Sequence, residues 1–115
     1  VQMNDLFISQ LLDLPNTYLG EAPPEVNTCQ WIVTSSGFSD TFFGKKTIDM
    51  PEYAVYVRDE LNGAASARIQ ESLKKLQNWN DEHNALLVSR LPAYVGRDEK
   101  HRSVYSFRVQ FIIGG

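Results

Sequence analysis

The side chains best suited to chemistry are two histidines and one cysteine, and their spacing matches no known catalytic or metal site. His83 and His101 have no Cys, His or Asp at a metal-site spacing, so we interpret both as surface residues. Cys29 lies in an apolar segment, which favours a buried structural thiol over a nucleophile. The seven glycines form no phosphate-binding loop. We therefore predict no catalytic, cofactor-binding or metal-binding residues, and no enzyme.

Charged residues gather in two places. Asp59 and Glu60 could bind a cation, but two acids after a strand more often favour the start of a helix through its dipole. The segment from Arg97 to Arg102 mixes basic side chains with Asp98 and Glu99. It is either a solvated hairpin tip or a rim that pairs with a neighbouring subunit. Sequence-specific nucleic-acid binding is disfavoured because the net charge is −3 and this cluster is half neutralised.

A strand followed by a long helix must position these side chains. Residues 53–58 are rich in β-branched and aromatic residues, which predicts a strand. Residues 59–63 break it. The next apolar residues step by four, four, three and three, which places them on one face of a helix. These residues are Ala65, Ile69, Leu73, Leu76 and Trp79.

The remaining elements are shorter. A first helix is predicted from Asn4 or Asp5 to Leu14. Strands are predicted over 28–34, 85–91 with an extension at 94–95, and 105–113, where apolar and polar residues alternate. Residues 35–37 should end the strand at 28–34. Residues 38–50 are expected to form a long loop or hairpin, with a possible extra strand. Its aromatic side chains either pack under the edge of the sheet or contact a partner. The fold class is α+β, a two-layer sandwich with two helices packed on one face of a mainly antiparallel sheet.

Length and composition are those of one ordinary globular domain, residues 1–115. The chain is 43% hydrophobic and 22% charged, and its single cysteine cannot form an internal disulfide. The first residues lack the basic region of a signal peptide. No apolar run approaches the ~20 residues of a membrane span, so no membrane partner is expected.

Two segments resemble the minor capsid and tail terminator family of long-tailed, siphovirus-type phages and prophages. In that family a strand reading P-x-x-A-V-Y-x-x-D leads to a helix, as residues 51–59 do here. A later hairpin reads G-R-D-E-x-x-R-x-x-Y-S-F, as residues 96–107 do here. With an N-terminal helix of suitable size, the resemblance covers about two-thirds of the chain.

The resemblance implies a structural virion protein located in the tail or neck, and in the host cytoplasm during assembly. Family members form a ring, commonly a hexamer, that caps the tail tube and joins it to the head connector. The implied partners are copies of the chain itself, the tail tube protein and the head-tail connector protein. Two alternatives stay open: a head-completion or other neck protein, and a small α+β ligand-binding or enzyme domain.

A ring needs subunit contacts rather than an active site. We expect those contacts from the aromatic loop, the end of the central strand, the charged hairpin and the polar face of the last strand. The residues are Phe42, Phe43, Arg58, Asp59, Arg97, Asp98, Glu99, Lys100, Arg102, Arg108 and Gln110.

Overall fold

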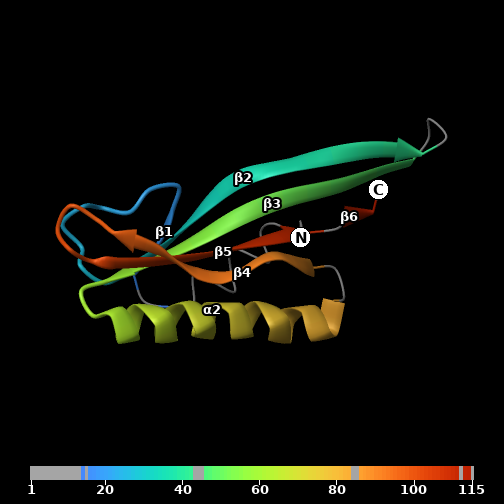
Figure 1. Cartoon of the computed structure of the whole chain (residues 1–115). Coiled ribbons are helices and arrows are strands. Elements are labelled where there is room, and N and C mark those ends of the chain that lie inside the picture. The colour runs from blue at the N-terminus through green and yellow to red at the C-terminus, as the bar shows by residue number, and fades with distance from the viewer. Residues whose placement is uncertain (1–13, 15, 43–45, 84–85, 112, 115) are drawn as a thin grey trace.

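The computed structural model describes residues 14, 16–42, 46–83, 86–111 and 113–114. Its elements follow the chain in the order shown in Figure 1. They are β1 (Thr17–Leu19), β2 (Cys29–Phe42), β3 (Lys46–Asp59), α2 (Asn62–His83), β4 (Leu86–Arg97), β5 (Ser103–Phe111) and β6 (Ile113–Gly114).

The strands form one six-stranded sheet in the order β1-β2-β3-β5-β4, with β6 pairing to β3. β1 is parallel to β2, whereas the other neighbours are antiparallel. The long strand β3 is the middle of this arrangement. Its inner half pairs with β2 on one side and with β5 on the other, from Glu52 opposite Gln110 to Asp59 opposite Ser103.

The predicted strand at residues 53–58 is confirmed as the inner half of β3. Tyr53, Val55 and Val57 alternate toward α2 and are buried, as the two-residue period of a strand requires. Phe107 and Val109 of β5 lie opposite Val55 and Tyr53 and are fully buried beside them. The apolar side of the last strand therefore meets the helix, as predicted.

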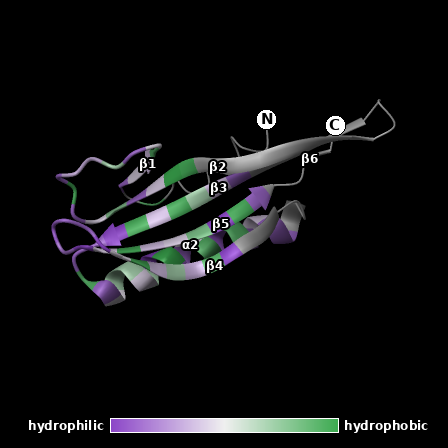
Figure 2. Ribbon diagram, turned by 45° about the horizontal axis from the view of Figure 1, so that its top comes forward, coloured by the Kyte–Doolittle hydropathy of each residue, from purple (hydrophilic) through white to green (hydrophobic). Residues whose placement is uncertain are grey.

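The predicted helical face is confirmed as well. All five apolar residues that share this face belong to the core cluster formed with β2, β3 and β5. Figure 2 shows the hydrophobic residues of α2 beside the strands that it covers. Glu71 and Lys74 lie on the exposed side. α2 ends at His83, so the polar segment after Trp79 continues the helix by one turn, which the sequence allowed.

A polar link also joins α2 to the sheet. The side chain of Gln30 in β2 is fully buried and accepts a hydrogen bond from Ser72 Oγ of α2. Its Nε2 donates to Thr17 Oγ1 in β1 at 3.3 Å. Because buried amide groups are costly when unpaired, this chain of contacts fixes the places of β1 and α2 relative to β2.

The prediction of two helices packed on one face of the sheet is wrong. In the described part of the chain, α2 is the one helix, and strands dominate. The first predicted helix, up to Leu14, lies outside the described residues apart from Leu14 itself, which is buried. The structure keeps the α+β class but places far more of the chain in the sheet.

A second difference from the prediction lies in β2. Ser35, Ser36 and Gly37 were expected to end the strand, but β2 continues to Phe42. The register shifts between Thr34 and Ser36, where a bulge accommodates the extra residue without ending the pairing. The residues predicted as a loop or hairpin at 38–50 thus extend β2 and β3 into a long hairpin.

Leu73→Ala tests the packing of α2 on the sheet. Leu73 is 7% exposed, and truncating a buried leucine typically costs about 2–5 kcal/mol in the free energy of unfolding. Urea denaturation followed by circular dichroism measures the change. Lys74→Ala, on the exposed side of the same turn, should change stability by less than about 0.5 kcal/mol. Equal stability of both variants would contradict the docking of α2.

Candidate subunit-contact surfaces

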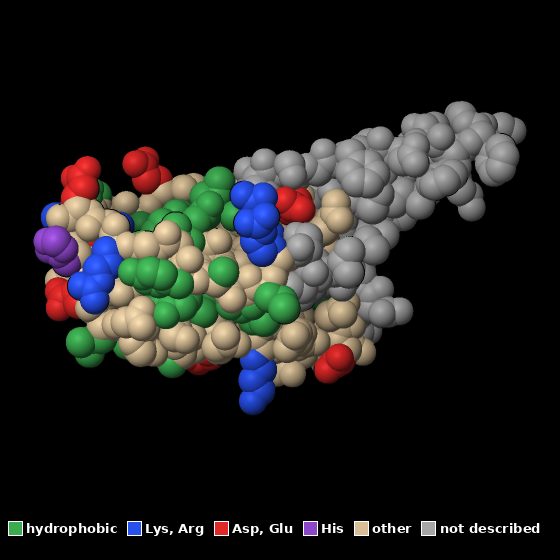
Figure 3. Space-filling view, in the orientation of Figure 1, with side chains coloured by type: hydrophobic (Ala, Val, Ile, Leu, Met, Phe, Trp, Pro, Cys, Tyr) green, Lys and Arg blue, Asp and Glu red, His purple; other side chains and the backbone are tan. Residues whose placement is uncertain are grey.

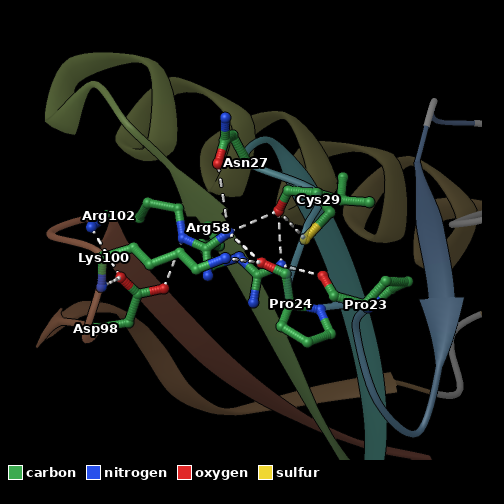
Figure 4. A network of polar contacts seen from close by, with 9 residues as sticks. Pro23, Pro24, Asn27, Cys29, Arg58, Asp98, Lys100 and Arg102 are labelled. Atoms are coloured by element: carbon green, nitrogen blue, oxygen red, sulfur yellow. Dashed lines mark hydrogen bonds and ion pairs between the residues drawn. The ribbon is translucent and has the colours of Figure 1, made fainter.

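One end of the sheet gathers five of the predicted contact residues. The end of β3 supplies Arg58 and Asp59, and the turn between β4 and β5 supplies Asp98, Lys100 and Arg102. Figure 4 shows four of these residues beside the segment 23–29 that leads into β2. We call this group the charged end of the sheet. Three of its side chains, those of Arg58, Asp59 and Arg102, are buried.

Arg58 holds the connecting segment against the sheet. Its Nη2 donates to the carbonyl oxygens of Pro23 and Val26, each at 2.6 Å. The guanidinium carbon also lies 5.4 Å from the centre of the Trp31 ring, within range of a cation–π contact. The guanidinium group of Arg58 therefore makes its contacts within the subunit, and the residue is only 8% exposed.

Arg102 reaches the same segment from the other side. Its Nη1 donates to the carbonyl oxygens of Pro24 at 2.9 Å and Val26 at 3.0 Å. Proline has no N–H, and this segment cannot join a strand ladder, so its carbonyls need donors from elsewhere. Two guanidinium groups, each with five N–H bonds, supply them. Arg58 and Arg102 together form a clamp on residues 23–26.

Asp98 shapes the turn that presents Arg102. Its Oδ1 accepts hydrogen bonds from the backbone N–H of Lys100 at 3.0 Å and of Arg102 at 2.9 Å. Its Oδ2 accepts from Arg102 Nε at 2.7 Å. Desolvation raises the pKa of Asp98, but the hydrogen bonds from Arg102 and Lys100 outweigh it, and the pKa lies below its usual value. His101 adopts the left-handed φ of 60° that closes this tight turn.

Asp59 links the start of the helix to the connecting segment. Its Oδ1 accepts a hydrogen bond from the backbone N–H of Leu61 at 3.0 Å, and its Oδ2 accepts one from Thr28 Oγ1 at 3.2 Å. These contacts fit the helix-start interpretation of this acid. The described residues contain no cluster of three potential metal ligands.

The other predicted residues lie apart or at the edge of this group. Arg97 and Glu99 are exposed beside the group, as is its own member Lys100, whose Nζ donates to the Pro24 carbonyl at 3.2 Å. Arg108 lies 3.8 Å from Glu52 Oε1, on the sheet face away from α2 that it shares by register with Gln110. Phe42 is the last residue of β2, and Phe43 lies outside the described residues.

A second surface, made of exposed hydrophobic residues, was not predicted from the sequence. Leu91, Tyr94 and Val95 of β4 are 72%, 51% and 59% exposed. The pairing of β4 with β5 shifts register between Arg90 and Ala93, around Pro92, so simple alternation fails there. Figure 3 shows hydrophobic side chains spread over the face of the molecule that carries β4 and α2.

Cys29 fits the structural role expected of it. It is fully buried and lies opposite Arg58 in the sheet. Burial raises the pKa of its thiol, while the nearby charges of Arg58, Arg102 and Arg68 act in the opposite direction. The thiol is therefore protonated at neutral pH, which disfavours nucleophilic chemistry. Among the described helical residues there is no helix with the length and hydropathy of a membrane span.

Comparison with known proteins agrees with the resemblance found in the two motifs. A family model described as "Bacteriophage tail terminator protein" matches residues 7–114. The match covers nearly the whole chain, including both the strand–helix segment and the charged hairpin. No curated protein matches the chain in sequence.

Asp98→Asn tests whether the charge of the Asp98 carboxylate stabilises the turn between β4 and β5. Because the folded-state pKa is lowered, the carboxylate stabilises the fold above its unfolded pKa near 3.9, and this stability is lost as the pH falls through the folded pKa. Wild type should exceed the variant in free energy of unfolding at pH 7, and the gap should narrow toward pH 3. Urea titrations at several pH values measure it, with Glu99→Gln as the exposed control. A gap that does not vary with pH would contradict this role.

Proposed function

The chain belongs to the bacteriophage tail terminator family, and we propose that its copies form a ring that caps the tail tube and joins it to the head connector. Family membership makes the chain a structural component of a phage tail, since this family is structural rather than enzymatic. The observation that carries the proposal is the family match over residues 7–114. Six copies is the number that the family resemblance favours.

Two features of the subunit support assembly. A closed ring needs two different surfaces on each copy, because every subunit meets its neighbours head to tail. The chain has a charged end, held rigid by the Arg58 and Arg102 clamp, and a separate hydrophobic surface on β4. The molecule is also elongated, with extents of 51 × 26 × 22 Å, so different ends can meet different partners.

The predicted contact residues divide into two roles in this proposal. Arg97, Glu99 and Lys100 are exposed and would meet a tube, connector or neighbouring subunit directly. Such rim charges chiefly set orientation and association rate. The buried residues of the charged end keep the rim in one shape, which lowers the ordering cost of binding. On the sheet face, Arg108 and Gln110 would add polar contacts. Phe42 and Phe43 stay predicted contact residues from the sequence.

Assembly on tail tubes tests the proposal. Purified protein is added to polymerising tail tube protein, and particles are observed by negative-stain electron microscopy and native mass spectrometry. The expected result is a ring at one tube end and an arrest of tube growth. The double variant Arg97→Glu with Lys100→Glu should slow capping by about tenfold or more at low salt, since rim charges steer association.

The matched control is Lys74→Glu, which changes an exposed charge on α2 away from the rim. It should cap tubes as the wild type does. A wild-type protein that stays monomeric in all conditions, and that neither binds tube protein nor arrests growth, would contradict the proposed function.

A further inference from the structure

Five large hydrophobic side chains are exposed in the described part of the chain, and four of them lie on the two outermost strands of the sheet. Leu91, Tyr94 and Val95 belong to β4 at one edge, and Leu19, which is 56% exposed, belongs to β1 at the other. The fifth, Leu61, lies before α2. In Figure 2, β1 and β4 lie on opposite sides of the sheet. Edge strands readily contact another chain, so both edges are candidate subunit contacts.

The exposed residues of the two edges lie at the same level of the sheet. The pairing register leads from Leu19 of β1 through β2 and β3 to Phe107 of β5. Phe107 lies opposite the register shift in β4 that contains Leu91. In the same way, Thr17 of β1 is in line with Tyr94 of β4. Two copies placed side by side at one level would therefore bring Leu19 of one to Leu91 of the other.

The strand directions fit this placement as well. β1 is parallel to β2, and each later neighbour in the sheet reverses direction, so β1 and β4 run in opposite directions. A copy of the same orientation beside β4 would thus present its own β1 antiparallel to that strand. Because β1 has only three residues and the pairing of β4 is interrupted by three register shifts, side chains would carry more of this contact than a backbone ladder.

The apolar layer between the sheet and α2 is open at both edges. Directly opposite residues of paired strands share a face, so Leu19 lies on the side of Ile32 and Tyr94 on the side of Tyr105. Ile32 belongs to the core cluster, and Tyr105 packs against it. Tyr94 meets the Tyr105 ring edge-on, with 5.4 Å between the ring centres, and is still 51% exposed. An edge-to-edge contact would continue this apolar layer from one copy into the next.

Charge favours a contact between the two different edges. The described side chains of β4, residues 90–97, include exposed Arg90 and Arg97 and no acid. Residues 16–28, which contain β1 and the segment after it, include exposed Glu21 and Glu25 and no Lys or Arg. Opposite charges would therefore surround an apolar centre, as in ordinary protein interfaces. A contact of β4 with a second β4, or of β1 with a second β1, would instead bring like charges together.

We propose that the β4 edge of one copy packs against the β1 edge of the next, with Leu91 and Leu19 at the centre of the contact. The two edges differ, so the contact is head to tail and can repeat until a ring closes. This inference rests on the proposed ring, and it names the surfaces that close it.

A pair of matched substitutions tests the β4 edge. Leu91→Lys should raise the protein concentration that caps half of the tube ends by about tenfold or more, because it places a charge at the centre of the apolar contact. Leu61→Lys is the control, since Leu61 is similarly exposed, at 70% against 72% for Leu91, but lies before α2. Negative-stain electron microscopy counts the capped ends, and circular dichroism checks that both variants fold. Capping by Leu91→Lys at the wild-type concentration would overturn the inference.

A cysteine pair tests the head-to-tail geometry. In the double variant Leu19→Cys with Leu91→Cys, oxidation of assembled rings should link neighbouring copies and give a ladder of oligomers on a non-reducing gel. Within one copy the two positions lie about 19 Å apart across the sheet, since neighbouring strands are about 4.8 Å apart, and this is too far for a disulfide. The native Cys29 is fully buried and does not compete.

The two single cysteine variants are the controls for this experiment. Each should stay unlinked, because a head-to-tail contact brings position 19 to position 91 rather than to its own equivalent. Rings of the double variant that give no ladder, or linked dimers in a single variant, would overturn the inference.

The two proposals fail differently. Rings that form without the link between positions 19 and 91, or that form in Leu91→Lys at the wild-type concentration, refute the edge contact and leave the ring intact. A wild type that remains monomeric even with tail tube protein refutes both.

Discussion

Packing of α2 against the middle of the sheet determines which surfaces of this protein remain for assembly. Ile69 and Leu76 of the helix belong to one core cluster with three residues of the sheet. These residues are Val55, Val57 and Phe107, and all five are fully buried. Because that packing occupies one face of the inner sheet, other molecules can meet the described part of the subunit at its ends, at its outermost strands and on its opposite face. The charged end and the exposed hydrophobic residues of β4, which we propose for assembly, lie in these places.

The charged end shows how two arginines hold a connecting segment against the sheet. Two buried guanidinium groups supply donors to a proline-containing segment that cannot pair its own carbonyls. The Val26 carbonyl accepts from both arginines. Removing Arg58 would take away the donor that it supplies to the Pro23 carbonyl, whereas removing Arg102 would leave Lys100 as a donor to the Pro24 carbonyl. The clamp therefore has a structural role, whereas the charges of Arg97, Glu99 and Lys100 beside it are exposed. Charge alone in the sequence does not distinguish the buried charges from the exposed ones.

Sequence periodicity predicted the elements whose partners are inside the core. α2 and β5 were found because apolar residues repeat every three to four positions in one and every two in the other. Arg58 and Asp59 were placed among the contact residues from their charge, and only the fold shows that the segment before β2 covers them. The strand at residues 85–91 was predicted, but the exposure of Leu91 was not, because the register shift between Arg90 and Ala93 depends on the pairing with β5.

The long hairpin marks the limit of local sequence information. Ser, Gly, Asp and Lys between residues 35 and 49 have low strand propensity, and their pairing depends on the opposite strand rather than on neighbours in the chain. The pairing appears only when the two strands are set in register. The hairpin puts much more of the chain into strands than expected, so the described part of the fold is mostly sheet with one helix.

A reconstruction of the head-proximal tail end by electron cryomicroscopy tests the central claim most directly. The account predicts a closed ring of this protein at that end, with the exposed charges of Arg97, Glu99 and Lys100 in every subunit at a protein contact. A tail end without this protein, or a ring in which these three side chains face only solvent, would contradict it.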